Sequence, residues 1–289
     1  MEAHNERQHE NIPRALVVQD LSCLGRCSLT VALPALSAMG VQAVPLPTAV
    51  LSTHTGGFGR PAACDLTGFL GDALAHYRSL GIRFDAVLSG YLASPAQAKR
   101  VEEALVDQTD ALKVVDPAMG DHGRLYGSLP QDMPACFRPL CARADVVTPN
   151  WTELFLLCGE PYAQEPLEEA RLAALCERLG APSVVVTGAP TPQGSANAVY
   201  SRAGGLTLIP FERLPAAYPG AGDLFAAVLC GYLLRGEPLL PAVRLVTRYM
   251  SRVVGETLRA GSPPREGLLL EANLPREGNL GAPAGGCPD

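Results

Sequence analysis

The sequence predicts an α/β protein with an open, doubly wound and mostly parallel sheet. Short runs rich in β-branched residues recur along the chain and end in polar or small residues; they span residues 14–20, 84–90, 112–116, 144–150 and 182–188. Continuous apolar runs of this length suit strands that are buried on both faces, as in parallel sheets. Helical patterns separate these runs, and strands that alternate with helices favour a sheet with helices on both faces.

Three of the helical segments can be placed from their residue patterns. In residues 65–81 the apolar side chains recur at helical spacing, and Gly81 follows them as a helix stop. Residues 94–108 begin with Ser94 as a candidate N-cap and Pro95 in the first turn, as helix starts prefer. Residues 224–234 are apolar on nearly every side, which predicts a buried helix that begins at about Leu224.

Length and charge bound the class of protein. The chain has 289 residues, of which 47% are hydrophobic and 18% charged, enough for a sizeable core. We expect one domain over residues 14–274, a flexible leader over 1–13 and a mobile tail over 275–289. Lys and Arg total 23 and Asp and Glu 29, a net charge of −6 without a long block of one sign, so nucleic acid is not an expected partner.

The longest apolar window and the cysteines indicate a soluble protein. Prolines interrupt residues 31–51, so this window does not predict a membrane span. The nine cysteines form no CxxC pair, and the first residues lack the apolar core of a secretory signal. These features predict a cytoplasmic protein whose thiols are reduced and mostly buried.

Two features place a ligand at the carboxyl ends of the strands. In a doubly wound sheet ligands bind at that edge, and the predicted strands end there in polar or small residues: Asp20, Gly90, Asp116, Asn150 and Thr187. The buried helix near residue 224 follows Gly220, Ala221, Gly222 and Asp223. Its first amides have no partner inside the helix, and together with the helix dipole they form a site for a phosphate that the glycines let approach.

Asp223 is then a candidate general base that takes a proton from an attacking hydroxyl while the amides stabilise the moving phosphoryl group. The alternative is an aspartate that only caps the helix. The chain contains no G-x-x-x-x-G-K-[ST] motif, no complete G-x-G-x-x-G motif in its first strand–helix turn, and no protein-kinase motif set. The prediction is therefore a phosphoryl-transfer enzyme of another architecture.

GAGDLFAAVL, from Gly220, resembles the G-[TA]-G-D signature of the ribokinase superfamily, and residues 14–274 resemble the pyridoxal (pyridoxamine, pyridoxine) kinases. Other stretches match the same subfamily in the same order: STHTGGFG from Ser52, VLSGYL from Val87, VVDPAMGD from Val114, VVTPNWTE from Val146 and VVVTG from Val184. The resemblance implies a three-layer ribokinase-like fold with a mostly parallel central sheet. It also implies ATP-dependent, Mg²⁺-assisted phosphorylation of the 5′-hydroxymethyl group of a B6 vitamer by direct in-line transfer. A homodimer and a K⁺ or Na⁺ ion are further implications.

The resemblance assigns roles to the candidate residues on the nucleotide side. Asp223 would be the base, with the amides of Gly220, Ala221 and Gly222 around the phosphoryl group; Ala221 stands where many relatives have threonine. The residues that would contact the nucleotide are Asp116, Asn150, Glu153, Thr187 and Tyr126, with Asp116 and Glu153 also near Mg²⁺. A monovalent cation would lie among Asp121, Thr148 and Thr187. Asn150 and Glu153 also have the spacing of a capping box, and both roles can coexist.

The resemblance also implies a flap and a vitamer pocket. GDHGRLYGSLP, from Gly120, resembles a flap that covers the nucleotide and excludes water, with Tyr126 in it. The candidate vitamer-binding residues are Asp20, His54, Thr55 and Tyr91, of which Tyr91 could lay its ring against the heterocycle. Asp20 stands where better-known relatives have serine, and we expect it to accept a hydrogen bond from the ring nitrogen or the ring hydroxyl.

Two other functions remain open at this point. One is a hydroxymethylpyrimidine kinase of the same fold, which the set of His54, Thr55 and Tyr91 and the lack of a cysteine in the loop before Gly220 disfavour. The other is a vitamer- or nucleotide-binding protein without turnover. The presence of Asp223, Asp116 and the glycines before Asp223 weighs against it.

Overall fold

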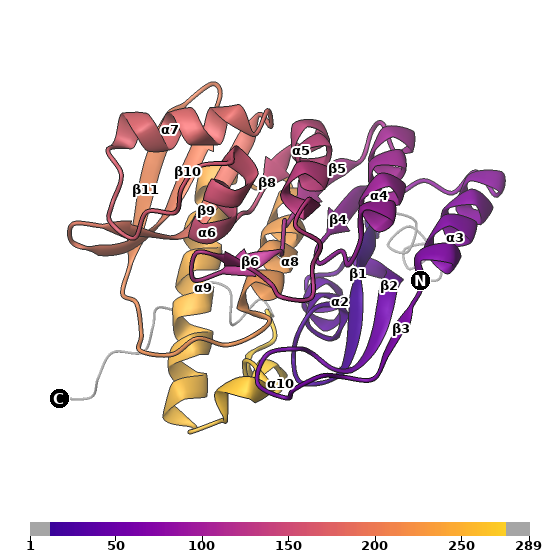
Figure 1. Cartoon of the computed structure of the whole chain (residues 1–289), viewed down its shortest axis with the longest axis horizontal. Coiled ribbons are helices and arrows are strands. Elements are labelled where there is room, and N and C mark those ends of the chain that lie inside the picture. The colour runs from indigo at the N-terminus through magenta and orange to yellow at the C-terminus, as the bar shows by residue number, and fades with distance from the viewer. Residues whose placement is uncertain (1–11, 276–289) are drawn as a thin grey trace, which may run out of the picture.

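The computed structural model describes residues 12–275, and these form a nine-stranded sheet in the order β11-β10-β9-β8-β5-β4-β1-β2-β3 (Figure 1). The predicted leader (1–13) and tail (275–289) lie almost wholly outside the described residues. The strands are β1 (Arg14–Leu24), β2 (Gln42–Thr53), β3 (Ala63–Asp65), β4 (Ala86–Ser89), β5 (Leu112–Val115), β8 (Val146–Val147), β9 (Ser183–Thr191), β10 (Gly194–Ser201) and β11 (Gly205–Phe211).

The six strands from β9 to β2 in this order are parallel, while β3 at one edge and β10 and β11 at the other are antiparallel. The five predicted runs overlap β1, β4, β5, β8 and β9, which are interior strands of the sheet. Their continuous apolar sequences follow from burial on both faces. The sequence pattern did not predict β2, whose prolines Pro45 and Pro47 lie within a parallel pairing with β1.

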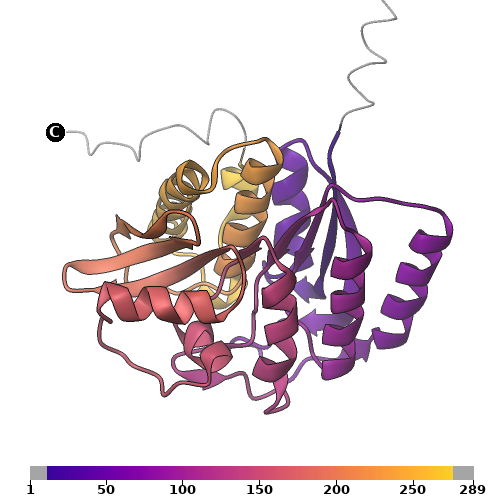
Figure 2. The same ribbon diagram turned by 90° about the horizontal axis from the view of Figure 1, so that it is seen from above.

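Helices cover both faces of the sheet, which confirms the three-layer arrangement (Figure 2). One layer contains α3 (Thr67–Ser79), α4 (Pro95–Asp107), α5 (Met133–Arg143), α6 (Trp151–Cys158) and α7 (Glu169–Arg178). The other contains α2 (Leu29–Ala38), α8 (Ala221–Leu234) and α9 (Leu239–Arg259). Each layer encloses its own apolar core against the sheet, so both faces of the central strands are removed from water.

The helix signals in the sequence are mostly confirmed. The Ser94 hydroxyl accepts the N–H of Gln97 at 3.3 Å and caps α4, and Gly81 follows α3 with a φ of +66°. The predicted start of the helix near Leu224 is wrong by three residues, because α8 begins at Ala221 with Gly220 as N-cap. Asp223 therefore lies inside the first turn of α8.

Two expectations about the chain as a whole can be compared with the described residues. Among residues 12–275 no helix combines the length and the apolar character that a membrane crossing requires. The eight cysteines in this range have free thiols, but only four are buried, and Cys23 and Cys64 are exposed. The expectation that most thiols are buried is therefore wrong, since Cys23 lies at the exposed carboxyl end of β1 and Cys64 lies on the exposed edge strand β3.

Candidate active site

Asp223 is a carboxylate held at one oxygen and open at the other. Its Oδ2 accepts the main-chain N–H of Ser28 at 2.8 Å and lies 3.5 Å from Sγ of Cys27. Within residues 12–275, Oδ1 has no hydrogen-bond partner. Burial and the nearby charge of Asp20 raise the pKa of Asp223 to about 6, against the hydrogen bonds from Ser28 and Cys27, which lower it. Asp223 can therefore exchange a proton at Oδ1 near neutral pH.

The start of α8 also presents free main-chain donors. The amides of Gly222 and Asp223 have no acceptor in the described part of the chain. The N–H of Ala221 donates to the carbonyl of Tyr218 at 3.3 Å. Of the predicted amide cradle, Ala221 is engaged here by the turn that leads into α8, and the amide of Asp223 is a further free donor among the described residues. Free amides at a helix start are a site for anions.

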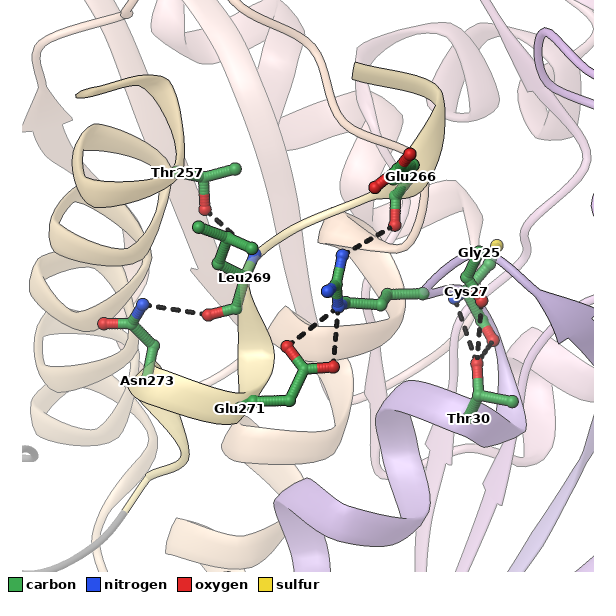
Figure 3. Close-up of polar contacts among 9 residues, drawn as sticks. Gly25, Cys27, Thr30, Thr257, Glu266, Leu269, Glu271 and Asn273 are labelled. Atoms are coloured by element: carbon green, nitrogen blue, oxygen red, sulfur yellow. Dashed lines mark hydrogen bonds and ion pairs between the residues drawn. The ribbon is translucent and has the colours of Figure 1, made fainter. Parts of the chain in front are cut away.

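The loop of residues 25–28 brings Ser28 to this helix start. Ser28 has a φ of +52° and a ψ of −129°, and His122 is the other non-glycine residue with positive φ among residues 12–275. The Thr30 hydroxyl lies 2.7 Å from the carbonyl of Cys27 and 3.3 Å from that of Gly25, and so closes the loop (Figure 3). The loop packs against the helix start so closely that a Cβ at Gly220 would overlap the carbonyl oxygen of Arg26.

Asp20, the predicted vitamer-side carboxylate, is joined to the base through Ser28. Asp20 is only 3% exposed, and its Oδ1 accepts the Ser28 hydroxyl at 2.5 Å while Oδ2 accepts the Ser22 hydroxyl at 2.8 Å. Burial raises the pKa of Asp20, and these two hydrogen bonds lower it. Ser28 thus donates its hydroxyl to Asp20 and its amide to Asp223.

His54 is buried, and both of its ring nitrogens are engaged. Nδ1 accepts the N–H of Gly56 at 3.0 Å, so Nε2 carries the proton and donates it to the carbonyl of Arg265 at 2.7 Å. His54 is therefore held between its own loop and residues 264–273, which we call the C-terminal segment. It can offer a ligand only its ring surface. Thr55, the other candidate on this loop, is exposed.

The C-terminal segment holds the loop of residues 25–28 in place (Figure 3). Both carboxylate oxygens of Glu271 accept Nε of Arg26 at 2.9 Å, and the carbonyl of Glu266 accepts the main-chain N–H of Arg26 at 3.0 Å. The segment is itself tied to α9, since the N–H of Leu269 donates to the Thr257 hydroxyl at 3.0 Å. The C-terminal segment therefore contacts the same loop whose Ser28 bonds to Asp223.

The predicted flap is a hairpin of β6 (Gly120–Asp121) and β7 (Arg124–Leu125). Tyr126 follows β7 and is 39% exposed; burial and then the nearby carboxylates raise its pKa. The hydroxyl of Tyr91 lies 3.3 Å from Oγ of Ser128 in the same segment, and burial raises the pKa of Tyr91 as well. The flap segment is thus in contact with the predicted vitamer-side residue Tyr91.

Asn150 and Glu153 form a capping box at the start of α6. The Asn150 side chain accepts the N–H of Glu153 at 2.9 Å, and Oε2 of Glu153 accepts the N–H of Asn150 at 2.8 Å. Oε1 of Glu153 also accepts the N–H of Met119 at 3.0 Å, and burial raises its pKa to about 8. Glu153 therefore holds the turn at Met119 in place, and its Oε2, which accepts a single amide, keeps one lone pair for a further contact.

Asp116 has the freer carboxylate. Its side chain is 6% exposed and has no hydrogen bond within residues 12–275, and Oδ2 would lie 3.6 Å from a Cβ at Gly222. Burial, and then the charges of Glu153 and Asp223, raise the pKa of Asp116. Unpaired carboxylate oxygens among like charges fit a divalent cation, which would reverse this shift. No group of three or more His, Cys, Asp or Glu side chains in the described part of the chain is arranged to hold a metal alone.

The three residues predicted around a monovalent cation differ in their surroundings. Oγ1 of Thr148 is buried without a hydrogen-bond partner among the described residues. Thr187 is partly buried and pairs with Asn150 in an isolated parallel bridge. Asp121 is exposed, and its Oδ1 accepts the N–H of His122 at 2.7 Å.

A cavity of about 360 Å³ opens at the start of α8. Its wall includes Asn150, Thr187, Ala221 and Gly222, together with apolar residues of α8 and α9 such as Phe225, Met250 and Val254. The volume lies in the range of small-molecule sites. Of the predicted site residues, Asp121, Asn150, Thr187, Ala221 and Gly222 line it, whereas Asp20, His54 and Tyr91 on the vitamer side do not.

Sequence reasoning missed several of these residues. Met250 and Val254 are four residues apart on α9, a spacing that the sequence shows but that also fits an ordinary buried helix face. Ser28 precedes an apolar helix and looks like an N-cap, although its side chain bonds to Asp20 instead of the helix. Its contact with Asp223 spans 195 positions, and no local signal reports it.

A doubly wound sheet, a glycine-led helix start with free amides and a buried carboxylate in its first turn are features of a small-molecule kinase of the ribokinase type. A family model described as phosphomethylpyrimidine kinase matches residues 31–265. The pyridoxine/pyridoxal/pyridoxamine kinase of Bordetella avium is 33% identical over 266 residues, covering 85% of this chain and 86% of the relative. The crystal structure of pyridoxal kinase from Lactobacillus plantarum superposes with a TM-score of 0.85 at 39% identity, covering 91% of this chain and 96% of that one. The chain belongs to the pyridoxal kinase family of the ribokinase superfamily, and it is a kinase.

Proposed function

We propose that the protein transfers the γ-phosphoryl group of ATP to the 5′-hydroxymethyl group of a B6 vitamer. The observation that carries the proposal is the state of Asp223: Ser28 fixes Oδ2, Oδ1 is open, and the free amides of Gly222 and Asp223 lie in the same helix turn. A base and an anion site in one turn are what in-line transfer to an alcohol requires. The names of the relatives supply the vitamer.

In this mechanism Oδ1 of Asp223 takes the proton of the attacking hydroxyl as its oxygen bonds to the γ-phosphorus, while the bond from that phosphorus to the bridging oxygen breaks and ADP leaves with the electron pair. The amides of Gly222 and Asp223 donate to the oxygens of the moving phosphoryl group, whose negative charge they stabilise without rearrangement. The attacking oxygen is that of the substrate, so no covalent enzyme intermediate forms. A positioned base contributes about 10²- to 10⁴-fold to such a reaction.

The 360 Å³ cavity is the proposed nucleotide site, because it ends at Gly222, beside the base. Its apolar wall of Phe225, Met250 and Val254 suits the adenine ring. The flap with Tyr126 would cover the phosphates and exclude water that would otherwise hydrolyse ATP.

Asp116 is the proposed protein ligand of Mg²⁺, since its oxygens have no partner among residues 12–275 and lie near the start of α8. Bound Mg²⁺ would neutralise phosphate charge during transfer and needs only one or two carboxylates besides water and phosphate oxygens. Thr148 is the best-supported residue for a K⁺ or Na⁺ ion, because its buried Oγ1 lacks a partner among the described residues. Thr187 and Asp121 would complete that site.

The vitamer would bind on the other side of Asp223, against Asp20, the ring surface of His54, and Tyr91. Asp20 and Tyr91 are close to one another, because the charge of Asp20 contributes to the raised pKa of Tyr91. Asp20 can accept a further hydrogen bond, because each carboxylate oxygen has two lone pairs.

The test is a product assay with ATP and Mg²⁺ and, in turn, pyridoxal, pyridoxine, pyridoxamine and hydroxymethylpyrimidine. We expect a phosphorylated vitamer from the unaltered protein. Asp223→Asn should lose at least about 10²-fold in turnover while it still binds ATP. The matched control is Asp110→Asn, which should retain turnover. Asp110 is exposed and lies just before β5, at the amino ends of the strands and away from the site.

Phosphorylation of hydroxymethylpyrimidine alone would favour the rival substrate of the same fold. Binding of vitamer and ATP without product would support a protein without turnover. Near-normal turnover of Asp223→Asn would refute the assignment of the base.

A further inference from the structure

We propose that Ser28 is a positioning residue that couples vitamer recognition at Asp20 to the orientation of the base Asp223. The inference rests on the proposed function and adds to it a residue that touches neither phosphoryl group nor proton in flight. Ser28 is the one residue among 12–275 that hydrogen-bonds to both carboxylates, through its hydroxyl to Asp20 at 2.5 Å and its amide to Asp223 at 2.8 Å.

The backbone of Ser28 is held in a conformation that a side chain normally avoids. Its φ of +52° with a ψ of −129° is a region that glycine occupies readily and serine does not. The serine is nevertheless not used as a helix cap, because its side chain makes no bond to the start of α2. Strain retained at a residue between two functional carboxylates points to a role for the hydroxyl that glycine could not supply.

Ser28 has little freedom to move independently of its neighbours. Its carbonyl accepts the amides of Val31 and Ala32, both at 3.0 Å, which anchors it to α2. The residue is 3% exposed. On the other side Arg26 is fixed to Glu266 and Glu271 of the C-terminal segment.

The geometry gives the coupling a direction. The hydroxyl bond orients Asp20, and the same residue's amide keeps Oδ2 of Asp223 occupied so that Oδ1 faces the acceptor alcohol. A displacement of Asp20 toward or away from a bound ring is therefore passed through one rigid residue to the base. Loss of the hydroxyl leaves the bond to Asp223 in place but removes the bond at Oδ1 of Asp20, so a vitamer held by Asp20 is no longer in fixed register with Oδ1 of Asp223.

Ser22 supplies a matched control. Its hydroxyl donates to Oδ2 of the same Asp20 at 2.8 Å and is fully buried, but it makes no contact with Asp223. Ser22→Ala and Ser28→Ala thus each remove one hydrogen bond to the Asp20 carboxylate. Only Ser28→Ala removes it from the residue that also bonds to Asp223.

The experiment measures kcat and the KM values for vitamer and ATP in the full-length variants Ser28→Ala, Ser28→Gly, Ser22→Ala, Asp20→Asn and Ser28→Ala with Asp20→Asn. We expect both Ser28 variants to lower kcat by about tenfold or more, the scale of a hydrogen bond to a charged group, with the KM for ATP unchanged. Ser22→Ala should lower kcat by less than about threefold. In the Asp20→Asn background, Ser28→Ala should cause a much smaller further loss.

Ser28→Gly separates coupling from folding, since it keeps the amide, removes the hydroxyl and relieves the backbone strain. If Ser28 had a purely structural role, Ser28→Gly would keep the wild-type kcat. That result would overturn the inference. Equal kcat losses for Ser28→Ala and Ser22→Ala, or additive losses with Asp20→Asn, would overturn it too. These results leave the proposed function intact as long as the unaltered protein phosphorylates a vitamer; absence of that activity refutes the proposed function itself.

Discussion

Gly220 and Gly236, at the two ends of α8, form a natural pair for testing how the base is placed. Their φ angles are +82° and +84°, so an alanine at either position costs about 1–2 kcal/mol of left-handed strain. A Cβ at Gly236 meets nothing within 4 Å, whereas one at Gly220 would overlap the carbonyl oxygen of Arg26 and lie 3.1 Å from Cα of Cys27. The two substitutions therefore share the cost of left-handed backbone strain, and only Gly220→Ala adds a steric clash.

The second cost can be worked from the contacts. The clashing atoms are backbone, and the N–H of Arg26 is bonded to Glu266, so the loop or the helix start must move by roughly 1 Å. Overpacking of this kind costs about 1–3 kcal/mol. We expect Gly220→Ala to lose about 2–5 kcal/mol of unfolding free energy and Gly236→Ala about 1–2 kcal/mol.

Gly220→Ala should also lower kcat much more than Gly236→Ala. A shift of this size would disturb the 2.8 Å bond between Ser28 and Asp223, and misplacement by about 1 Å can cost about 10²-fold in rate. Urea unfolding followed by circular dichroism gives the free energies, and a coupled ATP assay gives kcat. Equal losses of stability and equal kcat in the two variants would refute the close approach of the loop of residues 25–28 to α8.

Three further predictions follow from the same contacts. Because the pKa of Asp223 is raised to about 6 and a base must be ionised, kcat should fall as the pH drops through about 6; a flat profile from about pH 5 to about pH 7 would contradict the assignment. Arg26→Ala should lower unfolding free energy by about 1–2 kcal/mol and Glu271→Gln by less than about 0.5 kcal/mol, because the Glu271 side chain is 72% exposed while Arg26 also holds the Glu266 carbonyl; urea unfolding that ranked Glu271→Gln as the more damaging would contradict this. Thr148→Val removes a buried hydroxyl without a partner in the described chain, so the melting temperature should be unchanged or higher and activation by K⁺ should be lost; retained K⁺ activation would exclude Thr148 from the cation site.

Local sequence signals predicted the parts of this fold that local physics controls. The central strands are continuous apolar runs because both of their faces are buried, and the capping box at Asn150 and Glu153 is a pattern of four neighbouring residues. Strand β2 was not predicted because its two prolines disfavour a strand. Its pairing with β1 is visible only in the tertiary structure. The start of α8 was predicted three residues late, since Gly220 to Gly222 read as a loop and only Gly220 lies outside the helix.

The sequence by itself determined the fold class, the glycine-led helix start and the presence of a carboxylate beside it, because periodicity and turn chemistry can be recognised within short windows of sequence. Only the tertiary structure decided what that carboxylate does. It brings Ser28 from 195 positions away to hold one oxygen of Asp223 and engages both oxygens of Glu153 with amides, and it leaves the oxygens of Asp116 without a partner in the described part of the chain. Long-range packing sets which polar atoms are paired and which stay open, and a residue's type and spacing do not contain that information.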